Sequence, residues 1–76
     1  MKSLTIKLDT IEKVKNFVNI ISMQDGDFDL TSERYRVDAK SIMGIFSLDL
    51  TQNLGLDIHN DDDFEKIQEL LAPFMY

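Results

Sequence analysis

Hydrophobic residues recur along this chain with two alternating periods, one of two residues and one of about 3.6 residues. Alternation of apolar and polar residues predicts four strands, at residues 3–8, 28–31, 35–39 and 54–59. Helical spacing predicts two amphipathic helices, at residues 11–22 and 64–74, and a short apolar run predicts a third at residues 42–48. The expected element order is therefore β-α-β-β-α-β-α.

Strands with one apolar face and helices with one apolar stripe bury these surfaces best as two layers. We therefore expect an α+β fold in which an antiparallel four-stranded sheet carries three helices on one face. The turn residues Asp25-Gly26-Asp27 end the first helix, and Pro73 limits the last one. No linker or internal repeat interrupts residues 1–76, which predicts a single domain.

The two longer helices are predicted to have capping residues at their starts and an apolar stripe along one side. Asp9 or Thr10 is expected to cap the first helix, and residues 60–63 bring a capping side chain and negative charge to the last. The predicted buried stripes are Ile11, Val14, Phe17, Val18 and Ile21 in the first helix, and Phe64, Ile67, Leu70, Leu71 and Phe74 in the last.

The amino-acid composition of the chain disfavours several classes of function. Fourteen acidic and eight basic side chains give a net charge of −6, which disfavours binding to nucleic acid or to an anionic membrane surface. The chain has no cysteine and no long apolar run, so we expect a cytoplasmic protein. It also lacks a glycine-rich phosphate loop and the ligand spacing of a metal site, and its one histidine, His59, is expected at the surface of the fourth strand. We expect neither a cofactor, nor a bound metal, nor enzymatic activity.

The run Lys40-Ser41-Ile42-Met43-Gly44-Ile45-Phe46-Ser47-Leu48 places a hydroxyl at the start of a short apolar helix. Ser41 suits an N-cap, and because a helix start also attracts anions, it suits a phosphorylation site equally. The apolar side chains of this run cannot all face one side of a helix. Ile42, Met43 and Phe46 are therefore divided between core packing and an exposed docking patch.

This run resembles the HPr family, the small phosphocarrier proteins of the bacterial sugar phosphotransferase system, whose regulatory serine lies in a Lys-Ser-Ile-Met-Gly type motif. The predicted element order is similar to the order of this family along nearly the whole chain. The resemblance implies an open-faced sandwich. It also implies that Ser41 is a candidate for phosphorylation by an HPr kinase, and that Lys40, Ile42, Met43 and Phe46 contact protein partners.

The chain departs from the family at the start of the first helix. Counting back from Ser41 places Thr10 where the family has its phosphorylated histidine, and Glu12 where it has an arginine. A threonine hydroxyl forms a stable ester and needs a base to activate it, so Thr10 cannot relay phosphate as an imidazole does. The resemblance is therefore to a degenerate member without the active-site histidine, like the Crh type.

We expect a regulatory or protein-interaction domain that docks through the helix after Ser41 and lacks histidine phosphocarrier activity. The implied partners are an HPr kinase, a transcriptional regulator of carbon catabolite control such as CcpA, or a phosphotransferase-system protein such as enzyme I. Glu12 replaces an arginine expected to help the CcpA contact. Two alternatives stay open: a phosphocarrier that uses another residue, and a structural relic whose Ser41 only caps a helix.

Overall fold

A computed structural model describes residues 2–33, 35–59 and 62–75, and its elements follow the predicted order. The strands are β1 (Lys2–Ile6), β2 (Phe28–Ser32), β3 (Tyr35–Asp38) and β4 (Leu54–Ile58). The helices are α1 (Ile11–Ser22), α2 (Ile42–Phe46) and α3 (Phe64–Leu70), followed by the 3-10 turn η1 (Ala72–Phe74). Within the described part of the chain, no helix combines the length and apolar character needed to cross a membrane.

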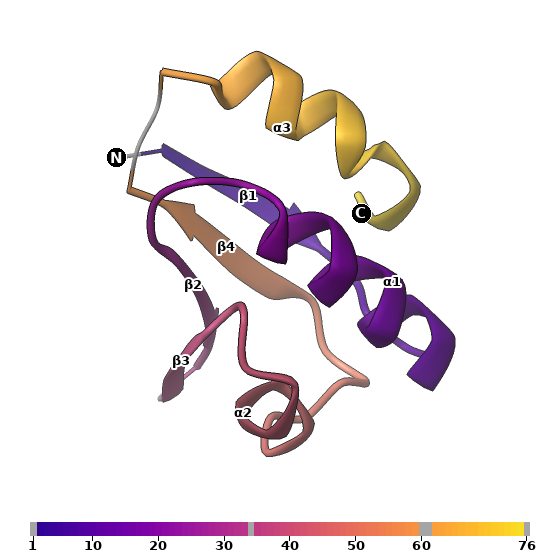
Figure 1. The fold of residues 1–76 in the computed structure, drawn as a ribbon. Coiled ribbons are helices and arrows are strands. Elements are labelled where there is room, and N and C mark those ends of the chain that lie inside the picture. Colours follow the sequence, from indigo (N-terminus) through magenta and orange to yellow (C-terminus); the bar gives the residue numbers. More distant parts are fainter. Residues whose placement is uncertain (1, 34, 60–61, 76) are drawn as a thin grey trace.

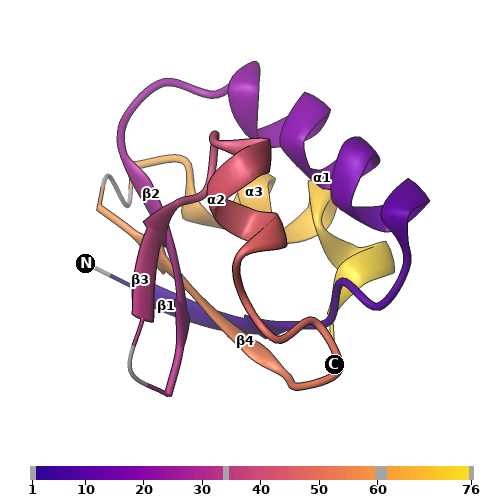
Figure 2. The same cartoon turned by 90° about the horizontal axis from the view of Figure 1, so that it is seen from below.

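The four strands form one sheet in the order β1-β4-β2-β3, and every neighbouring pair is antiparallel. All three helices lie on one face of this sheet, with α1 running between α2 and α3 (Figures 1 and 2). The opposite face is left open. This is the open-faced α+β sandwich that the hydrophobic periods predict.

The core is a single layer of apolar side chains between the sheet and the helices. The central strand β4 contributes Leu54, Leu56 and Ile58, all fully buried, and each such side chain stabilises the fold by about 1.5–3 kcal/mol. The Phe17 ring of α1 meets the Phe74 ring of η1 edge to face, with centroids 6.0 Å apart. This contact packs the end of the described chain against the first helix.

Two predictions about the helices are wrong in detail. Ile11 and Leu70, both expected in buried stripes, are 64% and 38% exposed. Ile11 is the first residue of α1 and Leu70 the last of α3, and beside Leu70 the buried stripe is formed by Ile67 and Leu71. Asp63 is the N-cap of α3 but makes no side-chain capping hydrogen bond. Of the other predicted capping candidates at residues 60–62, Asn60 and Asp61 lie outside the described residues.

Asp57 lies on the open face of β4, where alternation predicts an exposed side chain, yet it is only 8% exposed. Ser3 of β1 donates a hydrogen bond to its Oδ1 at 2.7 Å, and Arg36 of β3 donates to its Oδ2 at 2.9 Å. Arg36 also reaches Asp29 of β2 at 3.3 Å. These charge-assisted contacts join all four strands across the open face and satisfy the buried carboxylate.

Gly55 of β4 lies directly opposite Thr31 of β2 in the antiparallel register. A Cβ atom at residue 55 would be 2.5 Å from the Thr31 hydroxyl oxygen. That hydroxyl donates to the Gly55 carbonyl oxygen at 3.3 Å. A side chain at residue 55 therefore requires the Thr31 side chain to move.

We predict that Gly55→Ala lowers the free energy of unfolding by about 1–3 kcal/mol, because the Thr31 side chain must rotate and lose its hydrogen bond. In a Thr31→Ala background the same change should be neutral or slightly stabilising, since alanine also reduces the entropy of the unfolded chain. Urea unfolding of the four variants measures this coupling. Equal costs in both backgrounds would rule out the Thr31 contact as the cause.

Candidate functional site

Thr10 lies immediately before α1 and is its N-cap. Its backbone is extended, and its hydroxyl oxygen accepts a hydrogen bond from the Lys13 backbone N–H at 3.1 Å. The neighbouring Asp9 carboxylate forms an ion pair with the Lys13 ammonium at 3.0 Å, and this contact holds the pKa of Asp9 below its ordinary value. The Thr10 hydroxyl therefore caps the helix, and the Lys13 ammonium is already paired with Asp9.

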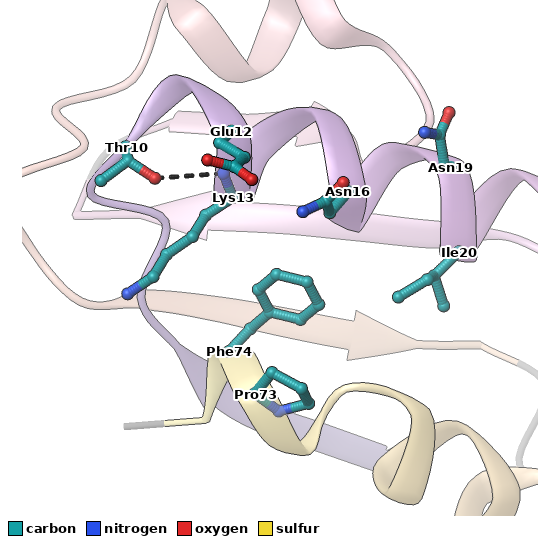
Figure 3. A pocket seen from close by; sticks show the side chains of 8 residues that line it. All are labelled: Thr10, Glu12, Lys13, Asn16, Asn19, Ile20, Pro73 and Phe74. Atoms are coloured by element: carbon teal, nitrogen blue, oxygen red, sulfur yellow. Dashed lines mark hydrogen bonds between the residues drawn. The ribbon is translucent and has the colours of Figure 1, made fainter.

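A groove of about 570 Å³ begins at Thr10 and runs along α1. Figure 3 shows Glu12, Lys13, Asn16, Asn19 and Ile20 of the helix on one side and Pro73 and Phe74 on the other. A phosphate group at Thr10 would meet the Glu12 carboxylate and a lysine that Asp9 neutralises. This electrostatic setting opposes phosphate binding.

His59 lies at the other end of the sheet from Thr10. Ile58, the residue before it, pairs with Lys2 at the start of β1, whereas Thr10 follows the end of β1. Its Nε2 lies 2.8 Å from the Asp29 carboxylate, and its side chain is 37% exposed. His59 is thus a surface residue of the open face, as expected, and its sheet position separates it from the start of α1.

Ser41 is the N-cap of α2, as the sequence predicts. Its backbone is extended, and its hydroxyl oxygen accepts a hydrogen bond from the Gly44 backbone N–H at 3.2 Å. Gly44 brings the helix close to the sheet, since a Cβ there would lie 3.3 Å from Val37 of β3 and 3.3 Å from the Ser41 oxygen. The half-buried Ser41 is therefore held between a helix start and a strand edge.

Lys40 makes contacts that the sequence did not indicate. Its ammonium donates hydrogen bonds to the carbonyl oxygens of Gln24 at 2.9 Å and Gly26 at 3.1 Å, and lies 5.7 Å from the centre of the Phe28 ring. These contacts tie the start of α2 to the turn after α1. These two bonds fix the position of the ammonium and leave one of its three N–H donors for any other acceptor.

The apolar side chains of α2 are divided between the core and the surface, as their spacing along the helix requires. Ile45 is fully buried, and Ile42 is half-buried and packs against the core. Met43 and Phe46, which we call the apolar patch, are 80% and 42% exposed. Of the predicted docking residues, these two present apolar surface to solvent, whereas Ile42 and Lys40 mainly support the fold.

The loop after α2 orders a carboxylate beside the apolar patch. Asp49 accepts hydrogen bonds from the Thr51 hydroxyl at 2.6 Å and from the Thr51 backbone N–H at 3.1 Å. The hydroxyl contact is the main reason why the pKa of Asp49 lies below its ordinary value. The sequence signal for this turn is the Asp-x-Thr spacing, which hydrophobic periods do not capture.

Sequence reasoning also missed the network of Asp57, Arg36, Asp29 and His59 on the open face. Alternation places all four residues on one face, but their pairing depends on the strand order β1-β4-β2-β3. Across residues 2–33, 35–59 and 62–75, no three His, Cys, Asp or Glu side chains are grouped in a way that could hold a metal ion.

Comparison with known proteins identifies a solved structure to which this chain is similar. No known protein-family profile matches the chain, and no curated protein sequence is similar to it. Among solved structures, the chain is similar to the crystal structure of HPr-C-His from Thermoanaerobacter tengcongensis, with 30% sequence identity and a TM-score of 0.81. The match covers 97% of this chain and 91% of that one. Both the fold and the sequence of this chain are therefore similar to those of that protein along nearly the whole chain.

We predict that Thr51→Val raises the pKa of Asp49 towards its ordinary value, because the variant loses the hydroxyl that stabilises the carboxylate. NMR titration of the Asp49 carboxyl measures this shift, and Asp9, which is held by Lys13, provides the internal control. With a lowered folded-state pKa, the Asp49 contribution to stability is present above the unfolded-state pKa. It is lost as the pH falls through the folded-state pKa. An unchanged Asp49 titration would contradict the assignment.

Proposed function

Because the chain belongs to the HPr family, we propose that it is a protein-interaction domain of the bacterial sugar phosphotransferase system that does not act as a histidine phosphocarrier. The observation that carries this proposal is the environment of Thr10. The residue expected at the phosphorylated position has a hydroxyl that caps α1, with Glu12 beside it and Lys13 paired to Asp9.

Phosphate relay requires a group that accepts a phosphoryl group and releases it readily. Threonine does not meet this requirement, and no histidine of the described chain lies at the start of α1. His59 is bound to Asp29 at the far end of the sheet. The geometry thus supports loss of the carrier role and gives no support to a carrier that uses another residue.

The apolar patch supports the interaction role. Met43 exposes 80% of its surface on a helix of only five residues, and Phe46 exposes 42% one turn later. Methionine adapts its flexible side chain to different partner surfaces, and aromatic residues often dominate binding energy. We infer that partners of the phosphotransferase system contact α2 through these two side chains.

Ser41 phosphorylation is a second candidate function, favoured by the position of the hydroxyl at the start of α2. A kinase would transfer the γ-phosphoryl group of ATP to the Ser41 oxygen, with loss of the hydroxyl proton and release of ADP. The new charge would lie near backbone N–H groups but also near Asp38, whose carbonyl oxygen accepts from the Ser41 N–H at 3.0 Å. Because Lys40 is already bonded, this site depends on the helix start more than on a cation.

We predict that incubation with enzyme I and labelled phosphoenolpyruvate gives no acid-labile phosphate on this chain. A histidine-containing HPr in the same reaction should become labelled, which shows that enzyme I is active. The physical reason is the absence of an imidazole at Thr10. Acid-labile label on this chain, lost in a His59→Gln variant, would instead establish a carrier that uses His59.

We predict that an HPr kinase with ATP adds one phosphate, and that Ser41→Ala abolishes this modification. Met43→Ala and Phe46→Ala should each lower the kcat/KM of phosphorylation by about tenfold, because the kinase loses apolar contacts on α2. Leu70→Ala, an exposed apolar residue on α3, is the matched control and should leave the rate unchanged.

Circular dichroism separates lost docking from lost folding in these variants. Ser41→Ala should cost about 1 kcal/mol of stability through loss of the N-cap, whereas Met43→Ala should change stability by less than about 0.5 kcal/mol. Equal kcat/KM values for phosphorylation of the Phe46→Ala and Leu70→Ala proteins would show that the kinase does not dock on α2. The absence of any phosphate would leave Ser41 as a cap alone.

A further inference from the structure

The turn that follows α1 and the start of α2 are joined by one half-buried side chain, that of Lys40. Its ammonium donates hydrogen bonds to the carbonyl oxygens of Gln24 at 2.9 Å and Gly26 at 3.1 Å. It also lies 5.7 Å from the centre of the ring of Phe28, the first residue of β2, which is within cation–π range. We call this set of contacts the α1–α2 joint.

The backbone at Lys40 is held as well, at the end of β3. The Lys40 N–H donates to Asp38 Oδ1 at 2.9 Å, and the Ser41 N–H donates to the Asp38 carbonyl oxygen at 3.0 Å. Lys40 is thus bonded through its side chain to the turn after α1 and through its backbone to β3. Because Ser41 directly follows Lys40, these contacts fix where the Ser41 hydroxyl lies.

The turn after α1 has a backbone conformation that favours glycine. Gly26 has a φ of 96°, which L side chains rarely adopt. The Gln24 N–H donates to the Ile21 carbonyl oxygen at 3.0 Å, so the turn follows directly on the last turn of α1. This helix has no basic residue in its own last turn, and the Lys40 ammonium supplies the positive charge that a helix C-terminus favours. Both ends of the α1–α2 joint are therefore adapted to each other.

Helix α2 depends on such a contact because it has only five residues, and a helix of this length is unstable by itself. Its N-cap bond runs from the Gly44 N–H to the Ser41 hydroxyl oxygen, at 3.2 Å. The same oxygen would form the bond to phosphorus during phosphoryl transfer, which alters the cap. The α1–α2 joint does not involve this oxygen, so it holds the helix start while the cap changes.

We propose that Lys40 is a positioning residue for the phosphorylation of Ser41, and that it acts through the carbonyl oxygens of Gln24 and Gly26. This inference rests on the proposed phosphorylation of Ser41 and names what controls that site. It differs from a role in which the Lys40 ammonium touches the kinase or the phosphate. The turn after α1 then becomes a control point, since a change at Gly26 reaches Ser41 through Lys40.

The first test is amide hydrogen exchange in the free protein. Lys40→Met keeps the apolar stem but removes the ammonium, whereas Gly26→Ala strains the turn and keeps the ammonium. Each variant should speed exchange of the Gly44 and Ile45 amides, which bond to Ser41, about threefold to tenfold. The Val14 amide, at the same position in α1, is the internal control. Unchanged exchange at Gly44 and Ile45 in Lys40→Met would overturn the proposal.

The second test measures phosphorylation by an HPr kinase with ATP. Lys40→Met and Gly26→Ala should each lower kcat about threefold to tenfold and change KM less than about twofold, because a misplaced hydroxyl slows the chemical step. Phe46→Ala should show the opposite pattern, a raised KM, since that side chain is proposed to dock. The double variant Lys40→Met/Gly26→Ala should be no slower than the slower single variant, because both remove one joint.

The other outcomes separate positioning from its alternatives. An unchanged kcat in Gly26→Ala, or additive losses in the double variant, would assign Lys40 to direct kinase contact and overturn the proposal. Lys66→Met, an exposed lysine of α3, makes the same charge change and should have no effect; an equal loss there would assign the effect to net charge. Gly26→Asn tolerates a positive φ better than alanine and should keep most of the wild-type rate.

Failure of this proposal is distinguishable from failure of the proposed phosphorylation. A wild-type protein that takes no phosphate would overturn the Ser41 site itself, and the role of Lys40 with it. A phosphorylated wild-type protein with an unchanged rate in Lys40→Met would overturn the positioning role alone. Circular dichroism of each variant shows whether it is folded, and Lys40→Met tests the joint without straining the backbone.

Discussion

The whole structure depends on one layer of apolar side chains between the sheet and the helices. A chain of 76 residues buries too little surface for a second core, so every strand and helix must contribute to this layer. Strand β4 is central to it, since it pairs with both β1 and β2 and buries Leu54, Leu56 and Ile58 completely. The open face then has no apolar cover and is held by polar contacts through Asp57.

This constraint explains which features the sequence could predict. A single layer makes each element one-sided, and one-sided elements carry a regular period, so the order, the strands and the helix caps Thr10 and Ser41 follow from local patterns. The same patterns predict the burial of residues at the ends of helices less well. Ile11 and Leu70 continue the stripes in sequence but are exposed in space, because coverage depends on neighbours that the period does not specify.

Local sequence patterns could not predict the long-range polar contacts. Asp57 looked like an ordinary exposed carboxylate until the strand order placed Ser3 and Arg36 beside it. Lys40 looked available for a phosphate on Ser41, yet it is held by carbonyl oxygens of Gln24 and Gly26, sixteen and fourteen residues earlier in the chain. In both cases the partner is set by tertiary structure, so no spacing rule could have found it.

The same constraint shapes the candidate interaction surface. Helix α2 has only five residues, and Gly44 draws it against Val37, so one side alone can reach the apolar layer. Ile45 and the half-buried Ile42 occupy that side, which forces Met43 and Phe46 outwards. A short helix built entirely of apolar residues and glycine therefore exposes part of its apolar surface. Its exposed remainder, Met43 and Phe46, is apolar surface that packing within the described domain leaves uncovered.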